Sequence, residues 1–325
     1  MNTNTSKKTG VNYIEINQTQ VGQRLDNLLL KKLKQVPKTW VYRIIRKGEV
    51  RVNKKRIKPD YKVKVGDLVR IPPLRLDQQQ DADVFIPPGL MAGIEKSVLF
   101  ENPHILVIDK PAGVAVHSGS GVSFGIIDIM RRIRPDTEIE LAHRLDRDTS
   151  GCLLLAKHRQ SLLAMQRCFQ DDSIAKVYLA VVKGRWPEAK REISHALSKK
   201  TMSNGERRVY ADSRGQNALT RILKLEAGDV YSILTIRLMT GCTHQIRVHC
   251  QIEGHEIAGD NKYGDERFNK MMKGRGVKNL MLHAASLELP ESKYCQAMVI
   301  DATLPAMFKG LIDDVPMKPC QNLSP

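Results

Sequence analysis

The sequence lacks several features that would place it in other classes of protein. It contains no uncharged apolar run of about 18 residues, the length that a membrane-spanning helix needs, so no transmembrane helix is predicted. The first ten residues, MNTNTSKKTG, are polar and lack the apolar segment of a signal peptide. We therefore interpret residues 1–20 as a flexible tail. No internal repeat occurs, and the one low-complexity tract is the three Gln residues at 78–80.

Motifs for metals and cofactors are also missing. The Gly-rich segment 119–125 matches a dinucleotide fingerprint only weakly, and no G-x-x-x-x-G-K-[ST] loop occurs. The cysteines form no Cys-x-x-Cys pair, which favours reduced thiols in a cytoplasmic protein and argues against zinc. We predict no metal and no small-molecule cofactor. The six cysteines are Cys152, Cys168, Cys242, Cys250, Cys295 and Cys320.

Acidic residues are few relative to basic ones. The chain holds 52 Lys and Arg against 35 Asp and Glu, a net charge of +17 at pH 7. A balance this basic indicates a polyanionic partner, with nucleic acid ahead of an anionic membrane. Residues 21–75 hold 17 Lys and Arg against 4 Asp and Glu, a net +13, so the rest of the chain carries +4. This asymmetry predicts a small basic docking domain joined to a nearly neutral body.

The basic region has the pattern of two helices followed by two hairpins. Apolar residues at helical spacing predict one helix beginning near residue 21 and a second at 38–47, between Pro37 and Gly48. Strand pairs are predicted at 50–52 with 56–57 and at 62–65 with 68–71. Residues 21–73 resemble an S4 RNA-binding domain, to which we assign residues 21–83. The cations expected to contact RNA are Arg43, Arg46, Lys47, Lys54, Lys55 and Arg56.

The remainder of the chain is predicted to contain a linker and a second, larger domain. Residues 84–96, which include Pro87-Pro88-Gly89, are predicted to be an exposed linker, and residues 97–325 a larger domain. Strands outnumber helices and do not alternate with them, which predicts an α+β fold with a mixed, largely antiparallel sheet. The strands are predicted at 105–108, 153–156, 177–182, 231–238, 244–250 and 297–303, and the helices at 124–133, 160–170 and 302–313.

The stretch 143–151, HRLDRDTSG, concentrates charge ahead of the apolar run 152–156. A charged loop leading into a buried strand is a common support for a reactive side chain. From these residues alone an ion-paired surface loop is the simpler interpretation, because most charge clusters are solvated pairs. Tyr178 likewise has the pattern of an ordinary core residue of a strand.

The segment 243–249, THQIRVH, is interpreted as a strand in which side chains alternate between two faces. Arg247 then lies on a polar face where a carboxylate can meet it. His244 and His249 lie on opposite faces of such a strand, so they cannot form a joint pair of metal ligands.

Several segments together resemble the RNA pseudouridine synthase family typified by the bacterial ribosomal enzymes. The matching segments are 109–113 (DKPAG), 143–151, 176–180 (KVYLA), 243–249, 254–260 (GHEIAGD) and 282–284 (LHA). The resemblance implies the pseudouridine synthase fold and an enzyme that isomerises uridines of 23S ribosomal RNA near the peptidyl-transferase region. It implies no cofactor, and we expect a cytoplasmic monomer that binds the large-subunit RNA or its precursor and no membrane.

The resemblance also implies roles for individual residues. Asp146 is the nucleophile or stabiliser at the glycosidic carbon, and Arg247 is its basic partner. Tyr178 stacks on the base and removes the proton from C5. A uridine must leave its helix to be reached, and the family position of Arg144 implies that it fills the gap. The remaining substrate contacts are implied for Leu282, which lines the pocket, and for His143.

Two positions and two rival functions stay open. Asp148 is a second carboxylate near Asp146, and the family motif gives the catalytic role to Asp146. Cys242 stands where the family commonly has Arg, so no role is carried over for that position. The rivals are a non-catalytic RNA-binding ribosome-assembly factor of the same fold and a metal-dependent hydrolase that uses the many His and Asp residues.

Overall fold

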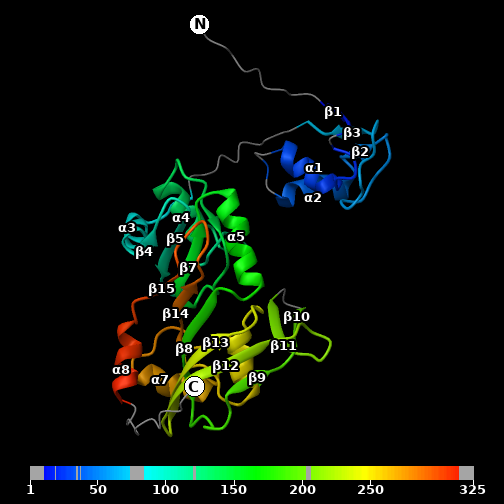
Figure 1. The fold of residues 1–325 in the computed structure, drawn as a ribbon. Helices are drawn as coiled ribbons and strands as arrows, with labels where there is room; N and C mark the ends of the chain where they lie inside the picture. The colour runs from blue at the N-terminus through cyan, green and yellow to red at the C-terminus, as the bar shows by residue number, and fades with distance from the viewer. Residues whose placement is uncertain are drawn as a thin grey trace. The chain divides into compact units, whose positions relative to one another are not determined.

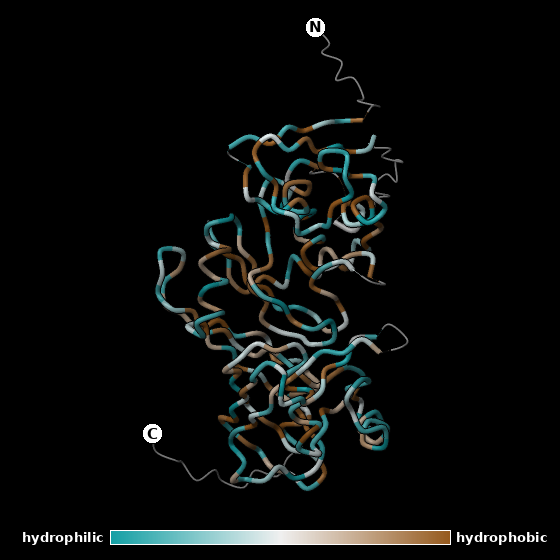
Figure 2. The backbone as a smooth tube through the Cα atoms, turned by 90° about the vertical axis from the view of Figure 1, so that its right-hand side faces the viewer, coloured by the Kyte–Doolittle hydropathy of each residue, from teal (hydrophilic) through white to brown (hydrophobic). Residues whose placement is uncertain are grey.

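The chain forms two compact units, residues 1–83 and 84–325 (Figure 1). The computed structural model describes residues 11–18, 20–33, 36, 38–73, 84–119, 122–202 and 206–314. Each unit has its own apolar core, and hydrophobic and hydrophilic stretches are interspersed along the chain in both (Figure 2). Within the described ranges, no helix has the length and apolar character needed to cross a bilayer.

The first unit packs two helices on a three-stranded antiparallel sheet. The apolar stripes of both helices are buried together with Val52 and Val69 of the sheet. The second helix has the predicted bounds, and Gly48 follows it with φ of 72°, a left-handed conformation suited to a helix end. The elements are α1 (Leu25–Lys32), α2 (Lys38–Lys47), β1 (Asn12–Glu15), β2 (Arg51–Val52) and β3 (Leu68–Ile71), with the strands in the order β1-β3-β2.

Two predictions for this unit are wrong. Residues 12–15, placed in the flexible tail, form β1 and pair with β3, whereas residues 1–10 lie outside the described residues. Residues 56–57 and 62–65 form no strand. The buried carboxylate of Asp67 holds the second segment instead, because it accepts hydrogen bonds from the backbone N–H of Lys64 and from the Tyr61 hydroxyl, both 2.9 Å long. The backbone of Val63 also pairs with Gly22 and Gln23 at 2.8 and 3.0 Å, so this segment is bound to residues before α1 and not to β3.

The second unit is built on a ten-stranded sheet. Its order is β4-β5-β7-β14-β8-β13-β12-β9, with β15 beside β14 and β6 beside β7. Only the β7–β14 pair is parallel, so the predicted mixed, largely antiparallel α+β fold is confirmed. The strands are β4 (Val98–Glu101), β5 (Ile105–Lys110), β6 (Glu140–Leu141), β7 (Ser150–Ala156), β8 (Ala175–Lys183), β9 (Glu192–Ser194), β12 (Leu219–Ala227), β13 (Tyr231–Leu238), β14 (Leu282–Leu289) and β15 (Met298–Asp301), and β10 (Leu197–Thr201) with β11 (Arg207–Ala211) forms a separate sheet.

Strand β7 is buried on both faces. Cys152 and Leu154 pack in one apolar cluster with the α5 side chain of Met165, while Leu153 and Leu155 belong to the larger cluster on the other face. A strand covered on both sides has an uninterrupted apolar sequence, as the run 152–156 does. The helices are α3 (Pro88–Lys96), α4 (Ile126–Ile133), α5 (Arg159–Gln170), α6 (Gln245–Ile252), α7 (Glu266–Gly274) and α8 (Ala306–Asp314).

Two predictions for the second unit are also wrong. The expected linker 84–96 contains α3, with Pro88 in its first turn and Ile94 buried in the core of the unit. The expected strand 244–250 is helix α6. The Gln245 side chain stabilises its start, accepting from Cys242 N at 3.0 Å and from Thr240 Oγ1 at 2.8 Å. Strand β14, for which no prediction was made, lies between β7 and β8.

Candidate active site

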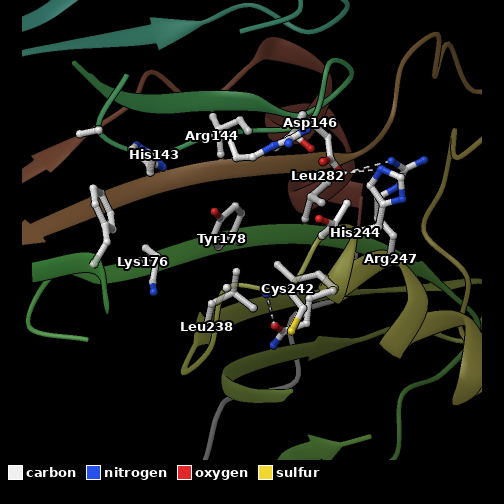
Figure 3. Close-up of a pocket in the computed structure, with 18 of the residues that line it drawn as sticks. His143, Arg144, Asp146, Lys176, Tyr178, Leu238, Cys242, His244, Arg247 and Leu282 are labelled. Carbon is white, nitrogen blue, oxygen red and sulfur yellow. Dashed lines mark hydrogen bonds and ion pairs between the residues drawn. The ribbon is translucent and has the colours of Figure 1, made fainter. Parts of the chain in front are cut away.

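Strand β14 brings two distant segments to one pocket of about 480 Å³. Its residue Ala284 pairs with Tyr178 of β8 on one side and with Gly151 of β7 on the other. The loop before β7 and the strand that carries Tyr178 therefore meet beside the start of α6. The pocket is lined by the predicted site residues Asp146, Tyr178, Arg247, Leu282, Arg144 and His143 (Figure 3).

Gly151 is required by the contact between β7 and β14. Its φ is 105°, a conformation that other residues rarely adopt. A Cβ atom at this position would also overlap the backbone carbonyl of Ala284. The glycine that ends the charged stretch therefore permits the close approach that sets the Asp146 loop against β14.

Lys110 anchors the same loop. Its side chain is fully buried, and Nζ donates to the carbonyl oxygens of Pro111, Val114 and Arg147 at 2.8–2.9 Å. Burial lowers the pKa of Lys110 to about 7, while the charges of Asp148 and Asp146 act to raise it. The three carbonyls accept all three hydrogens of an ammonium group, so we assign Lys110 the protonated form. The residue after Asp146 is thereby tied to the DKPAG turn.

Asp146 contacts Arg247, and Arg247 is held by a second carboxylate. Arg247 Nη1 donates to Asp146 Oδ2 at 3.2 Å. Its Nε and Nη2 donate to the two oxygens of Asp260 at 2.7 and 2.8 Å. Burial lowers the pKa of Arg247, but the bonds and charge of Asp260, followed by Asp146, raise it above its ordinary value. The guanidinium is therefore a fixed cation beside Asp146.

Sequence reasoning assigned no role to Asp260, although it lies in the matched motif 254–260. Its side chain is 1% exposed and also accepts hydrogen bonds from the backbone N–H groups of Lys262 and Tyr263, at 2.8 and 3.0 Å. Burial raises the pKa of Asp260, and its contacts with Arg247 and these N–H groups bring it below the ordinary value. An ionised carboxylate thus orients Arg247 from the side away from Asp146.

Tyr178 and Leu282 supply the apolar part of the wall, with exposed fractions of 7% and 4%. Burial raises the pKa of Tyr178, and the negative charge of Asp146 raises it further. The hydroxyl is therefore a neutral phenol in the free protein. What the wall offers to a ligand is an aromatic ring beside an aliphatic side chain.

The two residues before Leu145 differ in their surroundings. Arg144 is exposed, lines the pocket and makes no hydrogen bond to another described residue. His143 accepts a hydrogen bond from Leu154 N at 2.9 Å, and its ring lies 4.4 Å from that of Phe169. Burial, and then the charge of Lys176, lower the pKa of His143 to about 3. His143 is therefore a neutral group attached to β7, whereas Arg144 is free to meet a ligand.

Asp148 and Cys242 have no contact that suggests chemistry. Asp148 pairs with the exposed Arg147 at 3.2 Å and does not line the pocket. Cys242 lines the pocket, but burial raises the pKa of its thiol, which disfavours a reactive thiolate.

The predicted RNA-contacting cations of the first unit are all exposed: Arg43, Arg46, Lys47, Lys54, Lys55 and Arg56. Arg56 differs from the others because its Nη2 donates to the carbonyls of Lys47 and Arg46, at 2.8 and 3.3 Å. It therefore caps the C-terminal end of α2. Among described residues, the other five side chains have no hydrogen-bond or ion-pair partner.

Within the described part of the chain, no group of three or more His, Cys, Asp or Glu residues is arranged to hold a metal ion. His249 faces the core, where Nδ1 meets Thr220 Oγ1 at 2.9 Å. His244 faces the pocket, so the two histidines of this segment have separate surroundings.

Comparisons with known proteins identify the class. Residues 104–252 match the RNA pseudouridylate synthase family, and residues 23–69 match the S4 domain. The chain is 43% identical over 303 residues to a protein of Pasteurella multocida, covering 93% of both chains. It is 44% identical over 295 residues to one of Yersinia pestis, covering 90% of this chain and 92% of that one, and 43% over 297 residues to one of Escherichia coli, covering 90% and 93%.

The chain therefore belongs to the RNA pseudouridine synthase family and carries an S4 domain. Its three relatives above are each named ribosomal large subunit pseudouridine synthase C. The predicted family and the predicted enzyme class are confirmed.

Solved structures agree on the fold. Human RNA pseudouridylate synthase domain containing 4 matches with a TM-score of 0.57 at 22% identity, covering 71% of this chain and 97% of that one. Human RNA pseudouridylate synthase domain containing 1 matches with a TM-score of 0.51 at 26% identity, covering 70% and 96%.

Proposed function

We propose that this protein isomerises specific uridines of 23S ribosomal RNA near the peptidyl-transferase region, as a cytoplasmic monomer without a cofactor. The names of relatives that match over nine-tenths of the chain support the substrate class. The observation that carries the proposal is the placement of Asp146. Its carboxylate lines a pocket large enough for a nucleotide and contacts a buried, fixed arginine.

The reaction needs few parts. The bond between N1 of the base and C1′ of the sugar breaks, the base turns, and C5 bonds to C1′. C5 loses a proton and N1 gains one, so composition and oxidation state are unchanged. Asp146 acts as nucleophile or stabiliser at the electron-poor sugar carbon. Arg247 orients it, and Asp260 orients Arg247.

Tyr178 stacks on the base, and Leu282 closes the apolar side of the same space. Tyr178 is also the proposed acceptor of the C5 proton. Burial raises the pKa of Tyr178, so proton removal requires that the bound RNA lower this pKa again. Stacking on the base has no such requirement, because a neutral phenol ring can stack.

RNA docking is proposed for residues 21–83, where the predicted RNA contacts Arg43, Arg46, Lys47, Lys54 and Lys55 are exposed and have no partner among the described residues. The chemistry is proposed for the unit that follows, with α3 included in it instead of serving as a linker. Arg144 has the exposure and the freedom needed to fill the gap that a flipped uridine leaves.

The proposal is tested by replacing Asp146 with Asn in purified protein and measuring pseudouridine formation in 23S RNA from a strain that lacks the gene. We expect wild-type protein to restore modification and Asp146→Asn to abolish turnover while RNA affinity stays within about twofold. Asp148→Asn is the matched control, because Asp148 is a half-exposed carboxylate of the same loop that does not line the pocket, and it should keep full turnover.

The rival interpretation is a non-catalytic assembly factor. It predicts that RNA from the deletion strain is already fully modified and that wild-type protein adds nothing to unmodified RNA. A loss of RNA affinity in Asp146→Asn would instead make Asp146 a structural residue. Strand scission that a chelator stops would indicate the metal-dependent hydrolase.

A further inference from the structure

We propose that His244, held by Tyr263, is a positioning residue for Asp146. His244 and Arg247 face the same carboxylate oxygen, Oδ2, and thereby direct the other oxygen, Oδ1, toward the substrate. This inference rests on the function proposed above for Asp146.

The backbone of His244 is in an unusual conformation. Its φ and ψ are 55° and 21°, the left-handed region, at the residue that precedes α6. This conformation is unfavourable for most L residues, whereas Gly adopts it freely and Asn tolerates it better than most residues do. Strain of this kind persists where surrounding contacts over-determine it and is often found at functional sites. The contacts of the imidazole ring are therefore informative.

Tyr263 fixes which nitrogen of the ring carries hydrogen. The Tyr263 hydroxyl accepts a hydrogen bond from the backbone N–H of Val209 at 2.9 Å and lies 2.8 Å from His244 Nδ1. We assign the phenol hydrogen to the bond with Nδ1, because the N–H of Val209 already donates to the hydroxyl oxygen. In the neutral ring the hydrogen is then on Nε2. The guanidinium of Arg247 also lies over the Tyr263 ring, 5.1 Å from its centroid, so one tyrosine supports both partners of Asp146.

The hydrogen on Nε2 faces Asp146. The distance from Nε2 to Asp146 Oδ2 is 3.7 Å, and Arg247 Nη1 lies 3.2 Å from the same oxygen (Figure 3). Asp146 Oδ1 accepts no hydrogen bond from another described side chain or backbone group. The His244 contact is longer than a hydrogen bond, but such contacts commonly shorten when substrate binds. Two donors on one oxygen leave the second oxygen as the reacting one.

Charged groups surround His244 on several sides. Burial lowers the pKa of His244, the charges of Arg247 and Lys262 act in the same direction, and those of Asp146 and Asp260 oppose them. The ring is therefore neutral near pH 7. A neutral donor can hold Oδ2 without adding a second positive charge that would weaken Asp146 as a nucleophile.

The kinetic test compares His244→Ala, His244→Gln and Tyr263→Phe with wild type in steady-state assays on unmodified 23S RNA. Misplacement of a reacting group by about 1 Å costs about 10²-fold, so we expect His244→Ala to lower kcat by roughly 10–100-fold with KM nearly unchanged. His244→Gln should recover part of the rate, because its amide N–H group reaches toward Oδ2. Tyr263→Phe, which keeps the ring and removes the link to Nδ1, should lower kcat by about tenfold.

The control is His195→Gln. His195 bonds to Glu253 at 3.2 Å and does not line the pocket, so this variant should keep the wild-type kcat. Thermal unfolding of each variant separates a rate effect from a folding defect. With active wild-type protein, an unchanged kcat in folded His244→Ala, or a rise in KM alone, overturns the proposal.

A second measurement does not depend on turnover. Nitrogen NMR of the imidazole should show hydrogen on Nε2 and a pKa below the ordinary value. Asp146→Asn should lower that pKa further, because the charge of Asp146 acts to raise it. Hydrogen on Nδ1, or the same pKa in Asp146→Asn, contradicts the proposed contact. If wild-type protein forms no pseudouridine, the proposed function has failed, and the NMR result still decides the contact between His244 and Asp146.

Discussion

Replacing Asp260 with Asn asks whether a buried carboxylate fixes Arg247. The Asp260 side chain is 1% exposed and accepts two bonds from Arg247 and two from backbone N–H groups. Asn has nearly the same shape but carries no charge and has one acceptor oxygen instead of two. The variant therefore leaves the Arg247 guanidinium buried with only Asp146 as a charged partner.

The cost follows from that count. Removing one partner of a buried ion pair typically lowers the free energy of unfolding by about 3–5 kcal/mol. Because Asn keeps one of the acceptors, we expect Asp260→Asn to lower it by about 3 kcal/mol at pH 7. For a domain of this size, a change of that magnitude lowers Tm by roughly 6–12 °C. Activity should also fall, because Arg247 no longer has a fixed direction toward Asp146.

The assay follows unfolding of the second unit alone. The chain has two tryptophans: Trp40 in the first unit and Trp186, which is 1% exposed, in the second. In a Trp40→Phe background, Trp186 fluorescence therefore reports on the unit that contains Asp260. The control is Asp229→Asn, which removes an exposed ion pair with Arg185 in the same unit and should cost under about 0.5 kcal/mol.

The pH dependence supplies a second check. The pKa of Asp260 is depressed in the folded protein, so its contribution is present above the unfolded pKa of about 3.9 and is lost as pH falls through the folded pKa. The stability gap between wild type and Asp260→Asn should therefore narrow below about pH 4. Two results would refute this reasoning. One is a stability difference at pH 7 no larger than that of an ordinary surface substitution, about 0.5 kcal/mol. The other is a stability difference that does not change with pH.

Two more substitutions test other parts of the structure. Gly151→Ala should destabilise the second unit by on the order of 3 kcal/mol, because φ is 105° and the new Cβ meets the Ala284 carbonyl. Trp186 fluorescence measures this unfolding. A loss of stability under about 1 kcal/mol would contradict the close approach of β7 and β14. The double variant Arg43→Gln with Lys55→Gln should reduce the slope of log RNA affinity against log salt concentration by about 2. The control Lys309→Gln, which removes an exposed cation of α8, should leave this slope unchanged. Equal slopes in the two variants would contradict the docking role of the first unit.

Regular patterns in the sequence predicted the elements that have one dominant cause. Helix α2 has an apolar stripe between Pro37 and Gly48, and its observed bounds are those predicted. Strand β7 was predicted from its apolar run, because a strand buried on both faces needs no alternation. In both cases the local pattern and the packing agree.

Helix α6 shows why local patterns fail. Ile246 and Val248 alternate with polar residues, which suggested a strand. The alternation is misleading because every residue from Gln245 to Cys250 is buried, so the helix has no polar face to reveal its period. Its start depends on the Gln245 side chain, whose Nε2 donates to Leu219 O and Thr220 Oγ1 of the distant strand β12, both at 3.0 Å. No local pattern records such bonds.

The candidate site was also predicted only in part. The motifs indicated Asp146, Tyr178, Arg247 and Leu282, and the structure brings these four to one pocket. The residues that hold them were not predicted. Asp260 and Tyr263 act through contacts made across loops, and a contact of this kind leaves no spacing signal in a single sequence.

The position of β14 has a consequence for how the protein is synthesised. The pairs that bring Gly151 and Tyr178 together both include Ala284, which lies far beyond either of them along the chain. A ribosome that has released the chain only as far as Cys250 has therefore exposed the Asp146 loop, Tyr178 and Arg247, yet no strand joins the halves of the sheet. Such long-range pairing forms slowly. The nascent chain can thus present its basic first unit to RNA well before it can act on a uridine, and catalytic competence arrives only once β14 has been made.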